Sequence, residues 1–187
     1  FYVGPIHART ALANAAIASA HPLATAAGKT VLQQGGNAFD AAVAVAATLA
    51  VVEPYSSGLG GGGFFLLHRA RDAKQIMVDA RETAPAAATP NMYLDAAGAP
   101  IANASLVGPR AAAIPGLPAG LVYLARHYGR LPLKVSLAPA IKLAEEGHTV
   151  DARLAAMLQA RVDLLRAQPE AAARTTSASI AREPAAA

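Results

Sequence analysis

The polar residue with the most informative setting is Arg81, which directly follows the apolar stretch QIMVDA. Side chains at the end of a strand, beside a flexible loop, are commonly displayed for binding. A guanidinium group there can hold a carboxylate through two parallel hydrogen bonds, a geometry that the ammonium group of Lys cannot reproduce. The alternative is a surface ion pair with the neighbouring Asp79 or Glu82, worth at most about 1 kcal/mol. The residues by themselves leave both interpretations open.

A second candidate is the segment GLGGGG, residues 58–63, which has five glycines in six positions. Such a segment is typical of places where the backbone approaches a ligand or another part of the chain closely. Its glycines match the pattern G-x-G-x-x-G of dinucleotide-binding proteins, but that pattern requires a strand before it and a helix after it. Here a helical stretch comes first and a strand-like stretch follows, so the order argues against nucleotide binding.

Hydroxyl and imidazole side chains could supply a nucleophile and a base. No two of them form a recognisable local constellation, and one sequence cannot place them together in space. The absence of Cys excludes thiolate chemistry, and no His or carboxylate pair has the HExxH spacing of a metal site, so no metal is expected. The candidates are Ser56, Ser57, Ser105, Thr175, Thr176 and Ser177, with His7, His21, His68, His127 and His148.

The composition excludes several classes of protein. The 187 residues are 54% hydrophobic and 15% charged, which is typical of one globular domain over residues 1–187 with a sizeable core. The net charge of +4 comes from scattered basic residues with few aromatics, so nucleic-acid binding is not expected. The longest apolar run, residues 41–52, is shorter than the ~20 residues of a membrane span.

The helices and strands that would position these residues can be predicted from the spacing of apolar residues and from the turn and cap residues between them. Short apolar runs on either side of ARDAK predict a β-hairpin, with an irregular segment after it over residues 83–109. Helices are expected on both sides, a strand at residues 15–20, and no periodic signal in the Ala-rich tail, residues 169–187. Because two or three strands make a poor sheet, this α+β chain is expected to be part of something larger. Helices are predicted at 22–34, 37–53, 115–129, 132–147 and 150–168, and hairpin strands at 64–69 and 75–80.

Several blocks together resemble the N-terminal part of the large subunit of gamma-glutamyltranspeptidases. They are ASAHPLATAAGKTVLQQGGNAFDAAVAVAATLAVVEPYSSGLGGGGFFLLH, VDARETAP, GPRAAAIPGLPAGL and LAPAIKLAEEGHTV, in this order over residues 15–158. Agreement of several blocks in order is far more specific than a single glycine pattern.

The resemblance implies an N-terminal-nucleophile hydrolase, an αββα sandwich made from one precursor that cleaves itself into a large and a small subunit. The small subunit's N-terminal Thr would attack γ-glutamyl amides such as glutathione, forming a γ-glutamyl enzyme that passes the group to water, amino acids or dipeptides. Arg81 matches the family's Arg-Glu block and would hold the α-carboxylate of the glutamyl group. No organic cofactor is implied, and because the family is usually exported, a periplasmic or secreted location is expected.

The sequence departs from the family's pattern near its end. Thr175-Thr176 is followed by Ser177 rather than by the His of the family motif, and the 11 residues after Thr176 are too few for a small subunit. No catalytic residue is therefore expected in this chain, and activity would require the partner subunit. Two alternatives remain: a cephalosporin acylase of the same superfamily, which acts on glutaryl groups, and a non-catalytic, helix-rich interaction module.

Overall fold

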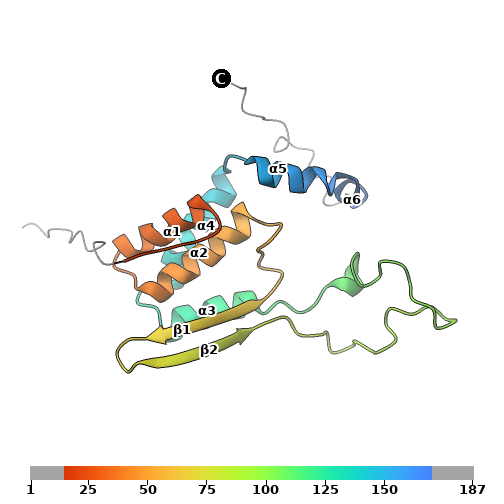
Figure 1. Ribbon diagram of the computed structural model, residues 1–187, viewed down its shortest axis with the longest axis horizontal. Helices are drawn as coiled ribbons and strands as arrows, with labels where there is room; N and C mark the ends of the chain where they lie inside the picture. Colours follow the sequence, from red (N-terminus) through yellow and green to blue (C-terminus); the bar gives the residue numbers. More distant parts are fainter. Residues whose placement is uncertain (1–14, 170–187) are drawn as a thin grey trace, which may run out of the picture. The chain divides into compact units, whose positions relative to one another are not determined.

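The computed structural model describes residues 15–169, and the chain divides into two compact units, Phe1–Ile141 and Lys142–Ala187. The first unit holds two helices, a two-stranded antiparallel sheet, and two further helices that follow a long loop (Figure 1). The boundary between the units falls inside α4. The elements are α1 Pro22–Gln33, α2 Ala38–Val52, β1 Gly63–Arg69, β2 Lys74–Ala80, η1 Pro109–Ala111, α3 Leu117–His127, α4 Leu133–Glu146, α5 Ala152–Gln159 and α6 Val162–Arg166.

Local signals at the helix ends explain where α1 and α2 begin and end. The Nδ1 atom of His21 accepts a hydrogen bond from the backbone N–H of Leu23 at 3.1 Å, ahead of a helix that begins at Pro22. The helix stops before Gly35, whose φ of 91° lies in the left-handed region. Asn37 then caps α2 in a reciprocal capping box with Asp40. These contacts confirm the predicted starts and stops of both helices.

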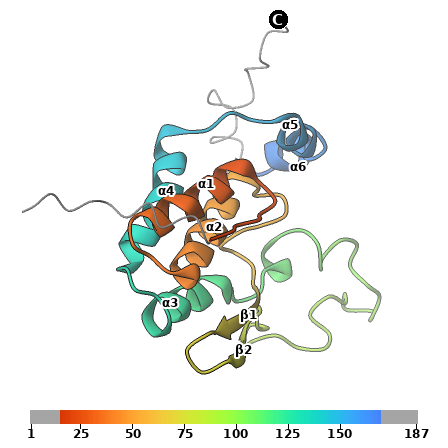
Figure 2. The ribbon, with the colours of Figure 1, turned by 60° about the vertical axis from the view of Figure 1, so that its left-hand side comes forward.

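The core of the first unit lies between α2, the hairpin, α3 and α4. Apolar side chains from all four regions meet there, which accounts for the near-continuous apolar sequence of α2. Figure 2 shows the helices of this unit grouped beside one another, with the hairpin at their edge. The buried members of the core are Val43, Ala47, Leu67, Leu121, Leu124, Ala125 and Ala140.

The hairpin has one face on the core and one face open. Its strands are in register from Gly63 opposite Ala80 to Arg69 opposite Lys74. Because side chains alternate along a strand, Leu67 is buried, whereas the other face presents apolar side chains to solvent. Phe64 is 57% exposed, Leu66 71% and Met77 61%, so the outward face is an uncovered apolar surface.

A buried carboxylate ties α2 to the turn between α3 and α4. Asp40 is fully buried and accepts hydrogen bonds from the backbone N–H groups of Asn37 at 2.8 Å, Arg130 at 2.9 Å and Leu131 at 3.3 Å. The side-chain amide of Asn37 adds a bond to the carbonyl oxygen of Tyr128 at 2.7 Å. Several hydrogen bonds compensate the desolvation of the carboxylate, so the pair Asn37–Asp40 joins segments about ninety residues apart.

Two sequence predictions differ from the structure. Residues 15–20 contain no strand, because a strand needs a hydrogen-bonding neighbour and the two strands among residues 15–169 pair with each other. The helix predicted over residues 150–168 is two helices, since the end of α5 tightens, with the N–H of Arg161 bonded to the carbonyl oxygen of Leu158 at 3.0 Å. Asp151 caps α5, because its Oδ1 atom accepts a 2.7 Å hydrogen bond from the N–H of Leu154.

Other features bear on the predicted organisation. Pro139 lies in the interior of α4, beyond the first turn, although a Pro is ordinarily tolerated in a helix only in the first turn or near a bend. Residues 83–109 form no strand and no helix apart from the start of η1, as predicted. The Ala-rich tail falls outside the described residues except at its first position, and the prediction of one incomplete domain over residues 1–187 stays a prediction.

Candidate functional site

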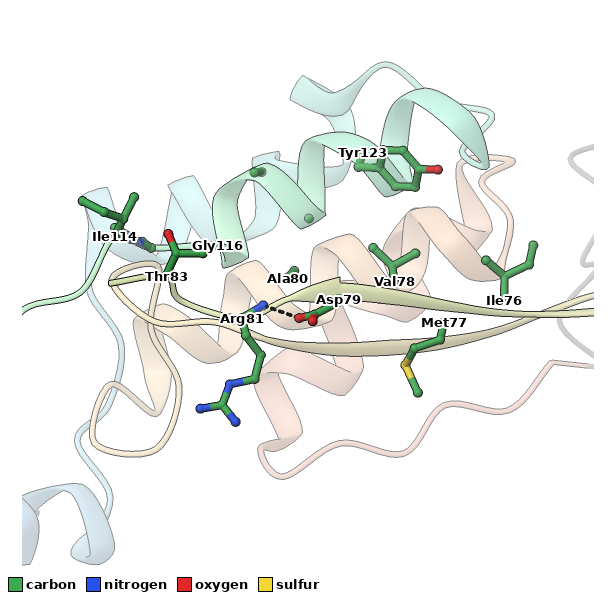
Figure 3. Close-up of a pocket in the computed structure, with 13 residues that line it drawn as sticks. Ile76, Met77, Val78, Asp79, Ala80, Arg81, Thr83, Ile114, Gly116 and Tyr123 are labelled. Carbon is green, nitrogen blue, oxygen red and sulfur yellow. Dashed lines mark hydrogen bonds between the residues drawn. The ribbon is translucent and has the colours of Figure 1, made fainter. Parts of the chain in front are cut away.

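Arg81 stands where its sequence setting predicted, one residue beyond the end of β2. Its backbone N–H donates to Oδ1 of Asp79 at 3.0 Å, which fixes the turn out of the strand. The side chain of Arg81 is 62% exposed. Its guanidinium carbon lies 5.8 Å from the ring centroid of Phe64, within cation–π range. Figure 3 shows the guanidinium group of Arg81 pointing away from α3, whereas the side chains of Ile76 and Val78 point toward α3.

The alternative interpretation, in which Arg81 forms a surface ion pair with Asp79 or Glu82, agrees with the structure only in part. Nε of Arg81 lies 3.6 Å from Oε2 of Glu82, an ion pair too long for a hydrogen bond. Asp79 binds the backbone of Arg81 rather than its guanidinium group. Within residues 15–169 no hydrogen bond occupies the five guanidinium N–H donors, so the group remains available to a ligand.

Arg81 borders two hollows on the surface of the first unit. One, of about 560 Å³, runs along β2 and the start of α3 and is mainly apolar (Figure 3). The other, of about 500 Å³, lies between the glycine-rich loop and the long loop after β2, and we name it the Arg81 pocket. Residues lining the Arg81 pocket include Gly60, Arg81, Glu82, Met92, Tyr93 and Arg110.

Two glycines, Gly62 and Gly116, lie against the backbone around Arg81. A Cβ atom on Gly62 would lie 2.6 Å from the carbonyl oxygen of Ala80, and one on Gly116 would lie 2.3 Å from the carbonyl oxygen of Arg81. None of the glycines in residues 58–63 has a positive φ, and Gly62 is the one among them where a Cβ atom would lie closer than 3.0 Å to the backbone. Close approach at Gly62, not an unusual turn, is therefore what requires glycine here. The glycine-rich loop is therefore packed on the segment that displays Arg81.

Backbone hydrogen bonds join the two ends of the long loop beside Arg81. Thr83 and Ile114 exchange N–H to carbonyl bonds of 3.2 and 2.9 Å. The carbonyl oxygen of Gly61 accepts from the N–H groups of Gly116 at 3.2 Å and Leu117 at 3.1 Å. The glycine-rich loop, the end of β2 and the start of α3 are thus joined by hydrogen bonds. The long loop between β2 and α3 extends away from this hydrogen-bonded region (Figure 1).

Among the other candidate side chains, the histidines within residues 15–169 have structural partners. His21 caps α1, His68 lies 2.9 Å from Nε2 of Gln75, and the ring of His127 stacks on Tyr123 with centroids 4.1 Å apart. Thr175 and Thr176 lie outside the described residues, as do His7 and Ser177. Within residues 15–169 there is no cluster of three His, Asp or Glu side chains that could hold a metal ion.

Sequence reasoning missed several residues of this site. Arg110 and Tyr93 line the Arg81 pocket, although 29 and 12 residues separate them from Arg81 along the chain. No local pattern marked them, because Tyr93 lies in the irregular segment, residues 83–109, and Arg110 directly follows it, where the sequence has no periodicity. Gly116 was visible only as part of a Pro-Gly start to a helix, and its contact with Arg81 depends on tertiary packing.

The comparisons with known proteins bear on this arrangement. The chain superimposes on the crystal structure of Helicobacter pylori gamma-glutamyltranspeptidase with a TM-score of 0.79 and 41% identity, covering 82% of this chain and 44% of that one. It also matches cephalosporin acylase from Bacillus halodurans, with a TM-score of 0.67 and 35% identity over 79% of this chain and 27% of that one. The fold class is that of the N-terminal-nucleophile hydrolases, of which the described residues supply helices and one hairpin.

The sequence comparison narrows the class to a family. The chain belongs to the gamma-glutamyltranspeptidase family, an enzyme family whose sequence model matches residues 24–183. It is 44% identical over 140 residues to the glutathione hydrolase proenzyme of Bacillus subtilis, a match that covers 74% of this chain. The chain spans 24% of that relative's length. None of the helices within residues 15–169 is long and apolar enough to cross a membrane.

Proposed function

We propose that this chain is the N-terminal part of the large subunit of a glutathione hydrolase that also acts as a γ-glutamyltransferase. In this proposal Arg81 binds the α-carboxylate of the γ-glutamyl group. The observation that carries the assignment is the exposed guanidinium group of Arg81, held by backbone contacts at the edge of a 500 Å³ pocket. A pocket of this volume falls within the usual range of small-molecule sites.

The chemistry itself belongs to a small subunit formed from the same precursor. The hydroxyl oxygen of its N-terminal Thr attacks the γ-carbonyl carbon, while the free α-amine of that Thr takes the hydroxyl proton. The amide C–N bond breaks, the proton passes to the departing amine, and a γ-glutamyl ester remains on the Thr. Water or the amine of an amino acid or dipeptide then attacks the ester and releases the Thr hydroxyl.

Arg81 would contribute orientation to this reaction. A bidentate bond to the α-carboxylate fixes one end of the glutamyl group and thereby the position of its γ-carbonyl carbon. The cation–π contact with Phe64 and the long ion pair with Glu82 restrict the side chain without occupying its hydrogen-bond donors. The guanidinium group is thus oriented before the substrate binds.

The test is Arg81→Lys in the reconstituted enzyme, with the chain combined with its small subunit. Losing the charge-assisted bidentate contact should weaken binding of a γ-glutamyl anilide by about 1.5–3 kcal/mol, seen as an increase in KM. Arg71→Lys, at an exposed position in the hairpin turn, is the matched control. An unchanged KM for Arg81→Lys would exclude the carboxylate contact.

A second candidate, cephalosporin acylase activity, is favoured by the structural match to an acylase. A glutaryl group carries a carboxylate that Arg81 could bind but lacks the α-amine of a glutamyl group, so Arg81 does not discriminate between them. Hydrolysis of glutaryl anilide in preference to γ-glutamyl anilide would favour the acylase. Activity toward neither substrate would favour the non-catalytic interaction module.

A further inference from the structure

The Arg81 pocket contains a second guanidinium group. Arg110, on η1, is exposed and lines the same 500 Å³ pocket as Arg81. The one carboxylate among the residues that line this pocket belongs to Glu82, which forms the long ion pair with Arg81. Two guanidinium groups and one carboxylate leave the pocket with a net positive charge, which suits an anionic ligand.

Contacts within the long loop hold Arg110 in place at the lining of the Arg81 pocket. Its Nη1 atom donates to the carbonyl oxygen of Met92 at 3.0 Å, and its own carbonyl oxygen accepts from the hydroxyl of Tyr93 at 3.1 Å. One guanidinium nitrogen is therefore used for orientation. Within residues 15–169 no carboxylate lies within ion-pair distance of Arg110, so its charge and remaining donors face the pocket or solvent.

We infer that Arg110 binds a second carboxylate, the C-terminal carboxylate of the peptide on the amine side of the scissile bond. This inference rests on the proposed function, in which Arg81 already holds the α-carboxylate of the glutamyl group. Glutathione carries a second carboxylate on its glycine, and a dipeptide acceptor carries one at the corresponding end. Because the departing and accepting amines react at the same carbonyl carbon, both peptides occupy one side of the pocket. The ligand class is γ-glutamyl peptides with a free C-terminus.

The competing explanation is that Arg110 only fastens the loop. Its bond to Met92 closes a stretch of eighteen residues, so removing it could loosen the wall of the pocket for every substrate. A carboxylate contact, in contrast, affects only substrates that carry the carboxylate. The two roles therefore separate when one variant is measured on two donors that differ in that group.

The experiment compares glutathione with γ-glutamyl-p-nitroanilide, whose departing amine carries no carboxylate, in the reconstituted enzyme without an acceptor. Arg110→Gln should raise KM for glutathione about 10-fold and leave KM for the anilide within about twofold. Arg110→Lys, which retains the charge, should recover part of the loss. Tyr93→Phe removes the hydroxyl bond within the loop but keeps the guanidinium group, and it should not discriminate between the donors.

A second measurement identifies the source of the carboxylate. With the anilide as donor, transfer to glycylglycine is compared with transfer to glycylglycinamide, and Arg110→Gln should reduce the preference for the free carboxylate. A selective effect in either measurement supports the inference and shows which peptide Arg110 contacts. Equal changes for all substrates, or no change, would overturn it. A wild-type enzyme inactive on both donors would instead contradict the proposed function.

Discussion

A Cβ atom on Gly62 would lie 2.7 Å from the Cα atom of Arg81, closer than real Cβ contacts occur. This contact shows what the glycine-rich loop does in the fold. The loop does not cradle a ligand through unusual backbone angles; it lets one strand begin directly against the end of the other. The position of the candidate carboxylate-binding residue thus depends on the absence of a side chain nineteen residues before it.

Gly62→Ala should displace the segment that carries Arg81. The added methyl group meets the backbone of Ala80, Arg81 and Glu82, which cannot move aside as a flexible side chain would. A destabilisation of about 1–3 kcal/mol, the usual range for overpacking, is expected together with a higher KM for γ-glutamyl anilide. Gly63→Ala is the control, because its Cβ atom would meet nothing within 4 Å. Equal stability and KM in the two variants would refute this account of the loop.

Asp40→Asn should destabilise the first unit without changing the Arg81 pocket. The substitution replaces one carboxylate oxygen by an NH₂ group, which faces backbone N–H donors such as those of Asn37 and Arg130. Each buried donor left unpaired costs about 1–3 kcal/mol. Thermal or denaturant unfolding of the reconstituted enzyme measures the loss, with the exposed Glu145→Gln as the control for a carboxylate-to-amide change. A variant as stable as the control would show that the Asp40 link contributes little.

The turn of the hairpin gives a pH-dependent prediction. Arg69 binds Asp72 through Nε at 2.9 Å and Nη2 at 2.6 Å, and these bonds lower the pKa of Asp72 from 3.8 to about 2. Because the folded state then holds its proton less tightly than the unfolded state, the contribution to stability is complete above pH 3.8. It declines as the pH falls toward 2. The wild-type advantage over Asp72→Asn should therefore disappear across this window.

An NMR titration of the Asp72 carboxyl group, with unfolding measured at several pH values, checks this prediction. Asp163→Asn, an exposed acid on α6, controls for the loss of one negative charge. An ordinary pKa at Asp72, or a difference from Asp72→Asn that persists at pH 2, would contradict the assigned role of Arg69.

The chain alone, residues 1–187, is not expected to form a stable monomer. Leu66 and Met77 face each other across the strands on the open side of the hairpin and are 71% and 61% exposed. An uncovered apolar face with unpaired strand edges favours association. Sedimentation combined with thermal unfolding tests this, and a cooperative melt of the isolated monomer would contradict it. Replacing both residues by Thr should reduce association, whereas Leu67→Thr, at a buried position, should unfold the chain.

The elements that sequence reasoning located correctly are those fixed by neighbours along the chain. Pro22, Gly35 and Asn37 mark the limits of α1 and α2 through first-turn geometry, a left-handed φ and a side-chain cap. The hairpin followed from two short apolar runs around a charged turn. Arg81 was singled out for the same local reason, since it directly follows a strand, but its role in binding stays a prediction.

Failures of the sequence predictions have a common cause. A strand at residues 15–20 required a pairing partner that the pattern of the segment could not reveal. Nothing in the amphipathic pattern of residues 150–168 marked the break between α5 and α6. In both cases the periodicity of side chains was compatible with the prediction, but the backbone hydrogen bonds of the structure were not. Residues 15–20 have no strand partner, and a bond from the N–H of Arg161 to Leu158 ends α5.

By itself the sequence determined the limits of α1 and α2, the hairpin and the display of Arg81 at a strand end, because caps, turns and periodicity act between residues a few positions apart. Tertiary structure alone decided what surrounds Arg81. The contacts of Gly62 and Gly116 with its backbone and the presence of Arg110 in the same pocket join residues 19 to 35 positions apart. The bond from the N–H of Arg130 to Asp40, elsewhere in the first unit, joins residues 90 positions apart. Such contacts follow from the packing of whole elements, which no local pattern of residues encodes.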